Sequence, residues 1–277
     1  MLKNLAYKII TLMRTTSQGR RLHEWLVLSA FKNTLTVEHN GVKLQFCVPN
    51  EWARLRAETF SSKEPETLEW IDGLGVDPVL FDVGANLGLY SLYTALKHPT
   101  AMVFAFEPSV FNLELLARNI VLNGLQDRII LIPLALNQLS STDTMRMSST
   151  SWGGAMNTFG KEYGYDGEKL DQVFSYKMLS CSLDDLLEYF DIEQPNAIKM
   201  DVDGIEHLIL KGGGSILKSQ QLKTILIEVN DDFPEQKNGV RELLEKAGLK
   251  LKIKKHAEWM DKSETLASTF NQIWSRD

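Results

Sequence analysis

The 277-residue sequence has few of the features that mark several common classes of protein. Its two cysteines, Cys47 and Cys181, stand far apart without a C-x-x-C pair, which argues against a disulfide framework and against a zinc site. This cysteine usage fits a reducing, cytoplasmic compartment. The five histidines are scattered with no pairing typical of metal ligands, so we expect no metal site. No apolar run approaches the roughly 20 residues that are needed to cross a bilayer.

Basic charge is also scarce over most of the chain. The formal net charge of -6 and the pI near 5.5 leave no general positive field, and no ladder of aromatic and basic residues is visible. We therefore expect no nucleic acid partner.

Residues 1–32 depart from this balance, because they hold six lysines and arginines against the single acid Glu24. Leu5, Ile9 and Leu12 recur there at helical spacing. The segment is predicted to be helical. It either makes peripheral contact with an anionic membrane or a partner, or packs as a solvated helix on the main domain.

The most informative stretch that is present runs from Val79 to Ser91. An apolar run carries Asp82 and leads into Gly84-Ala85-Asn86-Leu87-Gly88, after which a helical pattern begins. Gly84 and Gly88 allow a tight turn and a close backbone approach, and the following helix presents free amide donors to a carboxylate or phosphate. The stretch therefore predicts a cofactor-binding loop between a strand and a helix.

A second apolar run, residues 102–106, ends in Glu107, where an acid would accept hydrogen bonds from both ribose hydroxyls of an adenosine group. The loop is not G-x-G-x-x-G and lacks the Lys-Ser/Thr ending of a P-loop. Phosphate is therefore the weaker choice, and Asn86 disfavours an NAD-dependent dehydrogenase. S-adenosylmethionine combines an adenosine group with a carboxylate and has no phosphate, so it fits best. A glycine turn without a ligand is the other interpretation.

These motifs resemble the FkbM family of S-adenosylmethionine-dependent methyltransferases. The resemblance covers about residues 61 to 230. One departure is Asp203, since the family usually has Glu at that position. The shared pieces are Phe81–Ser91, Ala105–Ser109 with Asn112, Asn119 and Leu122-Asn123, Ser182–Leu186, Ile198–Glu206 and Ile225–Val229.

The order of the patterns predicts an α/β fold. Strand-like runs alternate with helix-like runs from residue 79 onward, which implies a doubly wound, mostly parallel sheet with its ligand at the carboxyl ends of the strands. The resemblance implies the Rossmann-like class I methyltransferase fold, with seven strands and an antiparallel last strand. Residues 1–60 would form a helical and hairpin cap, with Asn40-Gly41 as the hairpin turn, and residues 61–277 the cofactor-binding domain. The expected strands are 79–83, 102–106, 129–132, 196–200, 223–229, 249–254 and 270–274.

An irregular stretch interrupts this alternation between about residues 140 and 180. Trp152 and Tyr163 lie in it among several glycines. An insertion of this length is either a substrate-binding loop or a structural excursion. In the first case, Trp152 and Tyr163 would contact the substrate.

Three carboxylates near the end of the 196–200 run are candidates for catalysis. Asp201 would lie at the ligand-bearing edge of the sheet and is our first choice to orient or deprotonate the acceptor. Asp203 and Glu206 have the spacing of a capping box, which competes with a chemical role. Ser182 and Asp185 have the same spacing, and capping is favoured there.

We expect an O-methyltransferase that acts on a hydroxyl of a sugar, glycolipid or secondary metabolite. An N-methyltransferase for a peptide or amino sugar, and a noncatalytic module of the same fold, remain alternatives. Gly84, Ala85, Asn86 and Gly88 would hold the methionine part of the cofactor and Glu107 the ribose, while Ala135 would lie near the adenine. Asp82, at the end of the strand before the loop, is also expected to belong to the cofactor site. Glu66, after Pro65 in a predicted helix, either holds the cofactor's amino group or is an ordinary first-turn charge.

Overall fold

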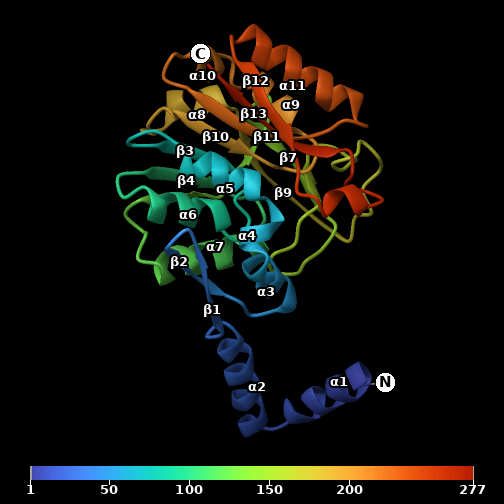
Figure 1. Ribbon diagram of the computed structural model, residues 1–277. Coiled ribbons are helices and arrows are strands. Elements are labelled where there is room, and N and C mark those ends of the chain that lie inside the picture. The colour runs from blue at the N-terminus through green and yellow to red at the C-terminus, as the bar shows by residue number, and fades with distance from the viewer. Residues whose placement is uncertain (1, 277) are drawn as a thin grey trace.

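The computed structural model describes residues 2–276, and its central sheet confirms the predicted α/β architecture (Figure 1). The strand order is β12-β13-β11-β10-β3-β4-β5. All pairs are parallel except those of β13, which runs antiparallel to both of its neighbours. Each strand begins and ends within one residue of its predicted bounds. The strands are β3 (Val79–Val83), β4 (Met102–Phe106), β5 (Ile129–Ile132), β10 (Ala197–Met200), β11 (Thr224–Asn230), β12 (Lys250–Lys255) and β13 (Thr269–Ser275).

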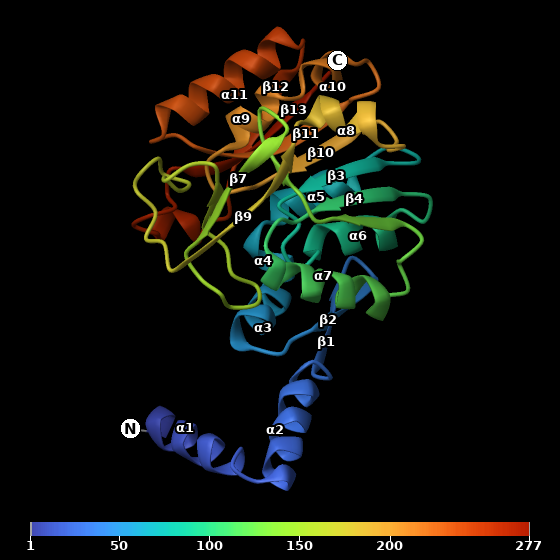
Figure 2. The same ribbon diagram turned by 180° about the vertical axis from the view of Figure 1, so that it is seen from behind.

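Helices cover both faces of this sheet (Figures 1 and 2). Alternate strand residues point to opposite faces, so Leu80 packs in one core and Phe81 in the other. The Leu80 core is closed by α5 (Pro65–Asp72), α6 (Leu89–Lys97) and α7 (Val110–Leu122). The Phe81 core is closed by α8 (Leu183–Tyr189), α9 (Glu206–Lys211), α10 (Gly214–Lys218) and α11 (Pro234–Lys246). This double covering leaves the carboxyl edge of the strands as the place for a site.

The hairpin expected around Asn40-Gly41 is present as β1 (Thr34–His39) and β2 (Val42–Cys47), and both turn residues have positive φ, 47° and 78°. Polar contacts tie β2 to α7, because the backbone amide of Cys47 donates to Asn119 Oδ1 over 2.7 Å. Two short helices follow, α3 (Glu51–Glu58) and α4 (Phe60–Lys63).

Two helices precede the hairpin, α1 (Leu2–Met13) and α2 (Ser17–Ala30). They project away from the rest of the molecule (Figures 1 and 2), so the interpretation of this segment as a helix packed on the main domain is wrong. No residue of α2 is buried. Within the described part of the chain, no helix is both long and apolar enough to span a bilayer.

The stretch between residues 140 and 180 is more regular than its sequence indicates. Strands β6 (Ala135–Leu136), β7 (Ser141–Met147), β8 (Asn157–Phe159) and β9 (Phe174–Cys181) form a second sheet in the order β6-β9-β7-β8. β7 pairs antiparallel with β9 over its whole length. No local apolar pattern predicts these polar strands. They are ordered because they pair with each other.

Candidate functional site

The predicted glycine loop connects β3 to α6 through three residues with positive φ, Gly84 at 85°, Asn86 at 52° and Gly88 at 84°. The backbone amides of Gly84 and Ala85 both donate to the carbonyl of Phe106, over 3.0 and 2.9 Å. A Cβ on Gly84 would lie 1.9 Å from the carbonyl oxygen of Asp201. The loop can therefore approach the end of β10 only with glycine at this position.

Gly88 serves a different contact. It forms the N-cap of α6, and a Cβ there would lie 2.6 Å from Leu116 Cδ1 in α7. Gly88 does not line the cavities around the loop. Its absent side chain allows α6 and α7 to pack closely, which is a structural role.

Glu107 follows β4 and lies next to the loop, as the sequence predicts. Its Oε2 accepts a hydrogen bond from the backbone amide of Asn86, and its Oε1 accepts one from that of Ser109, both over 2.7 Å. The side chain is buried, and burial raises the pKa of Glu107 to about 7 in spite of these donors. Glu107 thus fastens the glycine loop to the end of β4.

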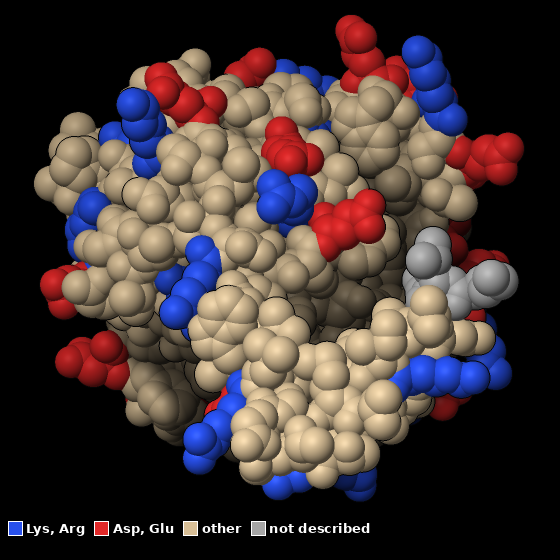
Figure 3. Space-filling model, turned by 90° about the horizontal axis from the view of Figure 1, so that it is seen from below, with Lys and Arg blue, Asp and Glu red and all other residues tan. Residues whose placement is uncertain are grey.

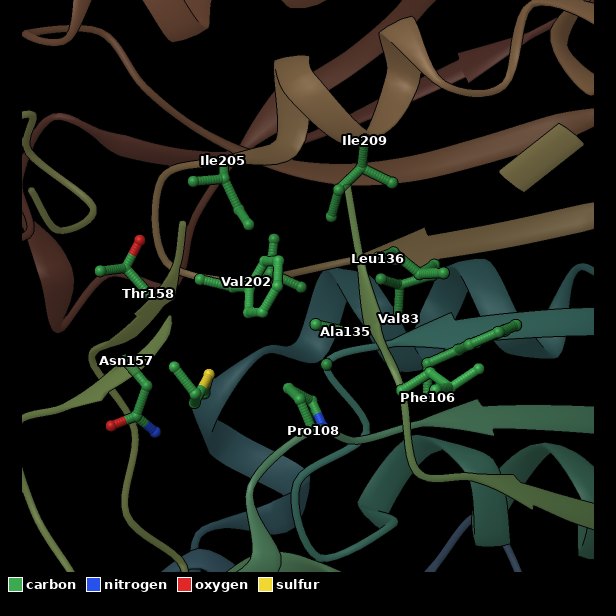
Figure 4. A pocket seen from close by; sticks show the side chains of 14 residues that line it. Val83, Phe106, Pro108, Ala135, Leu136, Asn157, Thr158, Val202, Ile205 and Ile209 are labelled. Carbon is green, nitrogen blue, oxygen red and sulfur yellow. The ribbon is translucent and has the colours of Figure 1, made fainter. Parts of the chain in front are cut away.

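Three adjoining cavities that share Gly84 form one groove along the carboxyl edge of the sheet. Its apolar end contains Ala135 together with Val83 and Phe106, and Ile205 and Ile209 close it from the α9 side (Figure 4). The middle of the groove is lined by Glu107, Pro108, Asn112 and Asn157. Ala135 therefore lines the apolar end of the groove, and its expected place near the adenine stays a prediction.

The polar end of the groove encloses about 940 Å³, including its open mouth. Two ion pairs lie in it: Lys199 Nζ is 3.3 Å from Asp201 Oδ2, and Lys63 Nζ is 2.5 Å from Glu64 Oε1. Burial favours the neutral amine of Lys199, yet the carboxylates of Asp201, Asp82 and Glu64 raise its pKa above the usual value. Lys199 is therefore a permanent cation directly beside Asp201.

Two further carboxyls at the polar end have raised pKa values. Burial, with the nearby charge of Asp201, raises the pKa of Asp203 to about 6. The same two causes raise the pKa of Glu228 well above its usual value. Asp203 has a positive φ of 63°, and its Oδ2 accepts a hydrogen bond from the amide of Asn157 in β8. The polar end thus presents two lysine-paired carboxylates, those of Asp201 and Glu64, beside two carboxyls, those of Asp203 and Glu228, whose pKa values are raised.

Two buried polar atoms in the wall of the groove have no partner among the described residues. They are Asn86 Oδ1, at the polar end, and Thr158 Oγ1, at the apolar end (Figure 4). Such atoms are costly to leave unsatisfied. A ligand with hydrogen-bonding groups at both of its ends would satisfy both atoms. The adenine and the amino-acid portion of S-adenosylmethionine are two such groups, so the residues present fit this cofactor.

Glu206 does not reach the groove, which corrects its selection as a catalytic candidate. Its Oε1 accepts a hydrogen bond from the amide of Val202, and its Oε2 accepts from the amide of Gly204 and from Gln236 Nε2. The expected capping box is also wrong, because Asp203 bonds to β8 instead of the first turn of α9. Glu206 holds the 202–206 turn in place.

Burial of Glu206 predicts a specific pH dependence of stability. Burial raises its pKa from 4.5 to about 7, so between these values the folded protein keeps a proton that the unfolded chain loses. Stability therefore falls as pH rises through this window, by up to ~3 kcal/mol from this group. In Glu206→Gln the group no longer titrates, and its share of the decline disappears.

Urea denaturation of both proteins at about pH 5 and about pH 7.5 measures this difference. Glu245→Gln, an exposed residue of α11 in an i,i+4 pair with Arg241, is the matched control and should follow the wild type. Parallel stability profiles for Glu206→Gln and wild type would contradict the assignment.

Two predicted cofactor residues lie outside the groove. Glu66 in α5 is buried, accepts a hydrogen bond from Asn271 Nδ2 over 2.7 Å and lines another cavity with Asn196, at the amino ends of the strands. Asp82 is buried within β3 and accepts from Ser91 Oγ of α6 over 2.5 Å. Each carboxylate thus has a hydrogen-bond donor within the fold, although Asp82 Oδ1 has none among the described residues. Glu64, two residues before Glu66, is the acid that reaches the groove.

The two aromatic candidates for substrate contact also lie elsewhere. The Trp152 ring packs edge-on against Phe31, with centroids 4.9 Å apart, and the Tyr163 ring packs against Phe233 at 5.3 Å. Tyr165 lines the polar end instead, and its hydroxyl donates to the carbonyl of Thr265. The aromatic-rich segment therefore reaches the groove through Tyr165 and not through Trp152 or Tyr163, and its contact with a substrate stays a prediction.

The segment 152–157 crosses the groove and is fastened to it. The carbonyl of Gly154 accepts hydrogen bonds from Asn86 Nδ2 and Asn112 Nδ2, over 2.9 and 3.0 Å. The amide of Gly153 donates to Asn112 Oδ1, and its carbonyl accepts from Arg56 Nε. We call residues 152–157 the strap, and its residues Gly154, Ala155 and Asn157 line the middle of the groove.

Other parts of the sequence analysis have simple outcomes. Ser182 caps α8, since its Oγ accepts a hydrogen bond from the amide of Asp185, as expected. Within residues 2–276, no cluster of histidine, cysteine, aspartate and glutamate side chains has the arrangement of a metal site.

Several residues of the polar end were missed in the sequence analysis, because they come from distant segments of the chain. These residues are Arg56, Lys63, Glu64, Met156, Trp259, Met260 and Leu266.

Comparisons with known proteins agree with this geometry. The model of the methyltransferase FkbM domain matches residues 82–260. The chain is 26% identical to hexuronic acid methyltransferase AglP of Haloferax volcanii over 247 residues, 88% of this chain and 94% of the relative. It is 31% identical to methyltransferase sdnD of Sordaria araneosa over 51% of this chain and 62% of the relative.

Two further relatives carry the family name. The chain is 26% identical to the 31-O-demethyl-FK506 methyltransferase FkbM of Streptomyces tacrolimicus, over 48% of this chain and 58% of that protein. A crystal structure of methyltransferase FkbM from Methylobacillus flagellatus superposes with a TM-score of 0.47 and 15% identity, over 72% of this chain and 43% of that one. The family match extends over more than half of the sequence and includes the glycine loop, Glu107 and Asp201. The chain therefore belongs to the FkbM methyltransferase family and is an S-adenosylmethionine-dependent methyltransferase.

Proposed function

We propose that this enzyme methylates a hydroxyl group of a sugar or another small secondary metabolite. The observation that carries the proposal is the polar end of the groove, where Asp201 lies against the glycine loop and acidic side chains outnumber basic ones. Carboxylates accept hydrogen bonds from hydroxyls, so this lining suits a neutral, hydroxyl-rich acceptor. The names of two relatives, which refer to a hexuronic acid and to FK506, support a sugar or a secondary metabolite as the acceptor.

The cofactor would lie along the groove with its amino-acid portion toward the polar end and its adenine toward the apolar end. We assign the amino-acid portion to the loop around Ala85 and Asn86, the ribose to Glu107, and the adenine to the apolar end near Ala135 and Thr158. When bound, S-adenosylmethionine supplies an electrophilic methyl group on its sulfonium. Gly84 gives the loop its close approach to β10, which keeps Asp201 beside this path.

Asp201 is our candidate for the group that accepts the hydroxyl proton. Lys199 places a positive charge beside it, with Nζ 3.3 Å from Asp201 Oδ2. Positioning of the acceptor supplies up to roughly 7 to 11 kcal/mol of the barrier reduction in favourable cases, more than the roughly 3 to 5 kcal/mol of one general base. The remaining side chains of the polar end, including Tyr165, therefore contribute chiefly by holding the acceptor in line.

Product analysis tests this function. The protein is incubated with methyl-labelled cofactor and separate pools of neutral sugars, uronic acids, glycolipids and amino sugars. We expect an alkali-stable methyl ether on an oxygen. A label that appears only on nitrogen, or only as an alkali-labile ester, would contradict methylation of a hydroxyl, and a protein that binds the cofactor but labels nothing would support a noncatalytic module.

Replacement of Glu107 tests the orientation of the cofactor. In Glu107→Ala the charged hydrogen-bond acceptor is lost, and we expect S-adenosylhomocysteine to bind more weakly by about 1 to 3 kcal/mol. Isothermal titration calorimetry measures the change. Glu114→Ala, which removes an exposed acid of α7 that pairs with Arg118, is the control and should bind normally. Unchanged affinity in Glu107→Ala would remove this residue from the cofactor site.

We also propose a cytoplasmic location, because both cysteines are free and buried, as in a reducing compartment.

A further inference from the structure

The two N-terminal helices combine exposed apolar side chains with unpaired positive charge. We call residues 2–32 the arm. In α1, Leu5, Ile9 and Leu12 share one face at i, i+4 and i+7, and Leu12 is 72% exposed. In α2, Leu22, Trp25 and Leu26 share one face at i, i+3 and i+4, and Trp25 is 60% exposed. A soluble monomer rarely leaves so continuous an apolar area uncovered, so the arm has a partner outside this chain.

The charges of the arm narrow the choice of partner. The arm contains several cations, among them Lys8, Arg14, Arg20 and Arg21, but only one acid, Glu24. None of these four cations forms an ion pair with another described residue. Figure 3 views the molecule from the end where the arm projects and shows a broad tan area bordered by blue side chains. Apolar side chains flanked by Lys and Arg are the pattern of helices that lie in the plane of an anionic bilayer.

A second copy of this chain fits the arm less well. A symmetric dimer places the same surface of both subunits against each other, so the cations of one arm would face those of its partner. Such a juxtaposition of like charges opposes association. An anionic lipid surface supplies the opposite charge and an apolar interior at the same time.

The charge of the remaining chain favours a defined orientation on such a surface. The whole protein carries a formal charge of -6 although residues 1–32 are strongly basic, so the body of the enzyme is acidic. An anionic bilayer attracts the arm and repels the body. We propose that the arm docks the enzyme on anionic phospholipid membranes, with α1 and α2 in the interface and the methyltransferase domain held off the surface.

Vesicle flotation tests this proposal with the full-length protein. Vesicles contain equal parts of phosphatidylglycerol and phosphatidylcholine, or phosphatidylcholine alone. We expect the wild type to float with the anionic vesicles, and less so at high salt. Since each basic residue near an anionic surface strengthens binding about fivefold, Arg14→Gln/Arg20→Gln/Arg21→Gln should weaken it by about 100-fold. Leu5→Gln/Ile9→Gln/Leu12→Gln should abolish flotation.

The control is Lys211→Gln/Lys218→Gln/Lys246→Gln, which removes three exposed lysines from the body and should float like the wild type. Binding of S-adenosylhomocysteine should be the same in all variants, which shows that they are folded. Quenching of Trp25 fluorescence by brominated lipid, obtained by comparison with Trp25→Phe, reports insertion of α2.

Three results would overturn the proposal: no flotation of the wild type with anionic vesicles, equal flotation of the arm variants, or an arm-dependent dimer in light scattering that does not bind vesicles. None of these measurements depends on methyl transfer, so they leave the proposed function untouched.

Discussion

Gly84→Ala should abolish cofactor binding and strongly destabilise the protein. The added methyl group would lie 1.9 Å from the carbonyl oxygen of Asp201, and the backbone φ of 85° already disfavours any side chain. Two backbone segments, neither of which is a flexible side-chain end, would have to move apart. We expect a loss of roughly 3 to 5 kcal/mol in the free energy of unfolding. Calorimetry with S-adenosylhomocysteine should detect no binding.

Gly124→Ala separates backbone conformation from overlap. Gly124 also has a positive φ, 67°, but a Cβ there would meet nothing within 4 Å. The Gly124→Ala variant should lose only about 1 to 2 kcal/mol of stability, the cost of a left-handed conformation. It should bind S-adenosylhomocysteine with normal affinity. Affinity in Gly84→Ala within threefold of the wild type, roughly the scatter of such measurements, would show that the loop does not seat the cofactor.

Asp201→Asn should lower the turnover number by about 100-fold or more, the usual range for loss of a general base, while cofactor affinity stays close to that of the wild type. The amide has the shape of the carboxylate but does not accept the acceptor's proton at neutral pH. Its loss of charge also leaves Lys199 without its nearest partner. Single-turnover assays with labelled cofactor measure the chemical step directly.

Asp127→Asn is the matched control, because Asp127 is exposed and far from the groove. Its turnover should be unchanged. If Asp201→Asn retains full turnover, proton removal by this residue is excluded. A parallel loss in Asp203→Asn with normal Asp201→Asn would move the role to Asp203, which lies in the same polar end.

The centre of the sheet could be predicted from the sequence because β3, β4, β10 and β11 are short, buried apolar runs separated by turns and helix-like patterns, whereas the edge strand β12 is exposed. Burial on both faces makes such runs continuous, so their ends are easy to locate. β7 and β9 were not recognised because their residues are largely polar and partly exposed. Their stability comes from pairing with each other across the sequence, which local periodicity does not encode.

The residues of the candidate site also divide into those that the sequence could predict and those that it could not. Gly84, Asn86, Glu107 and Asp201 follow the ends of adjacent parallel strands, so topology alone brings them together. Glu66, by contrast, was selected from a helix whose rotation about its axis is set by tertiary packing. Residues two apart point in nearly opposite directions around a helix, so roughly half a turn of rotation decides whether Glu64, the N-cap, or Glu66 faces the groove. The sequence contains no measure of that rotation.

The fastening of the strap has a kinetic consequence. Asn112 bonds to both Gly153 and Gly154, and Asn86 and Arg56 bond to the same two residues, so the strap lifts only when all four hydrogen bonds are broken together. Opening is then a cooperative event. If the demethylated cofactor leaves through this opening, opening of the strap limits the turnover number. Acceptors that differ widely in reactivity will then show the same maximal rate.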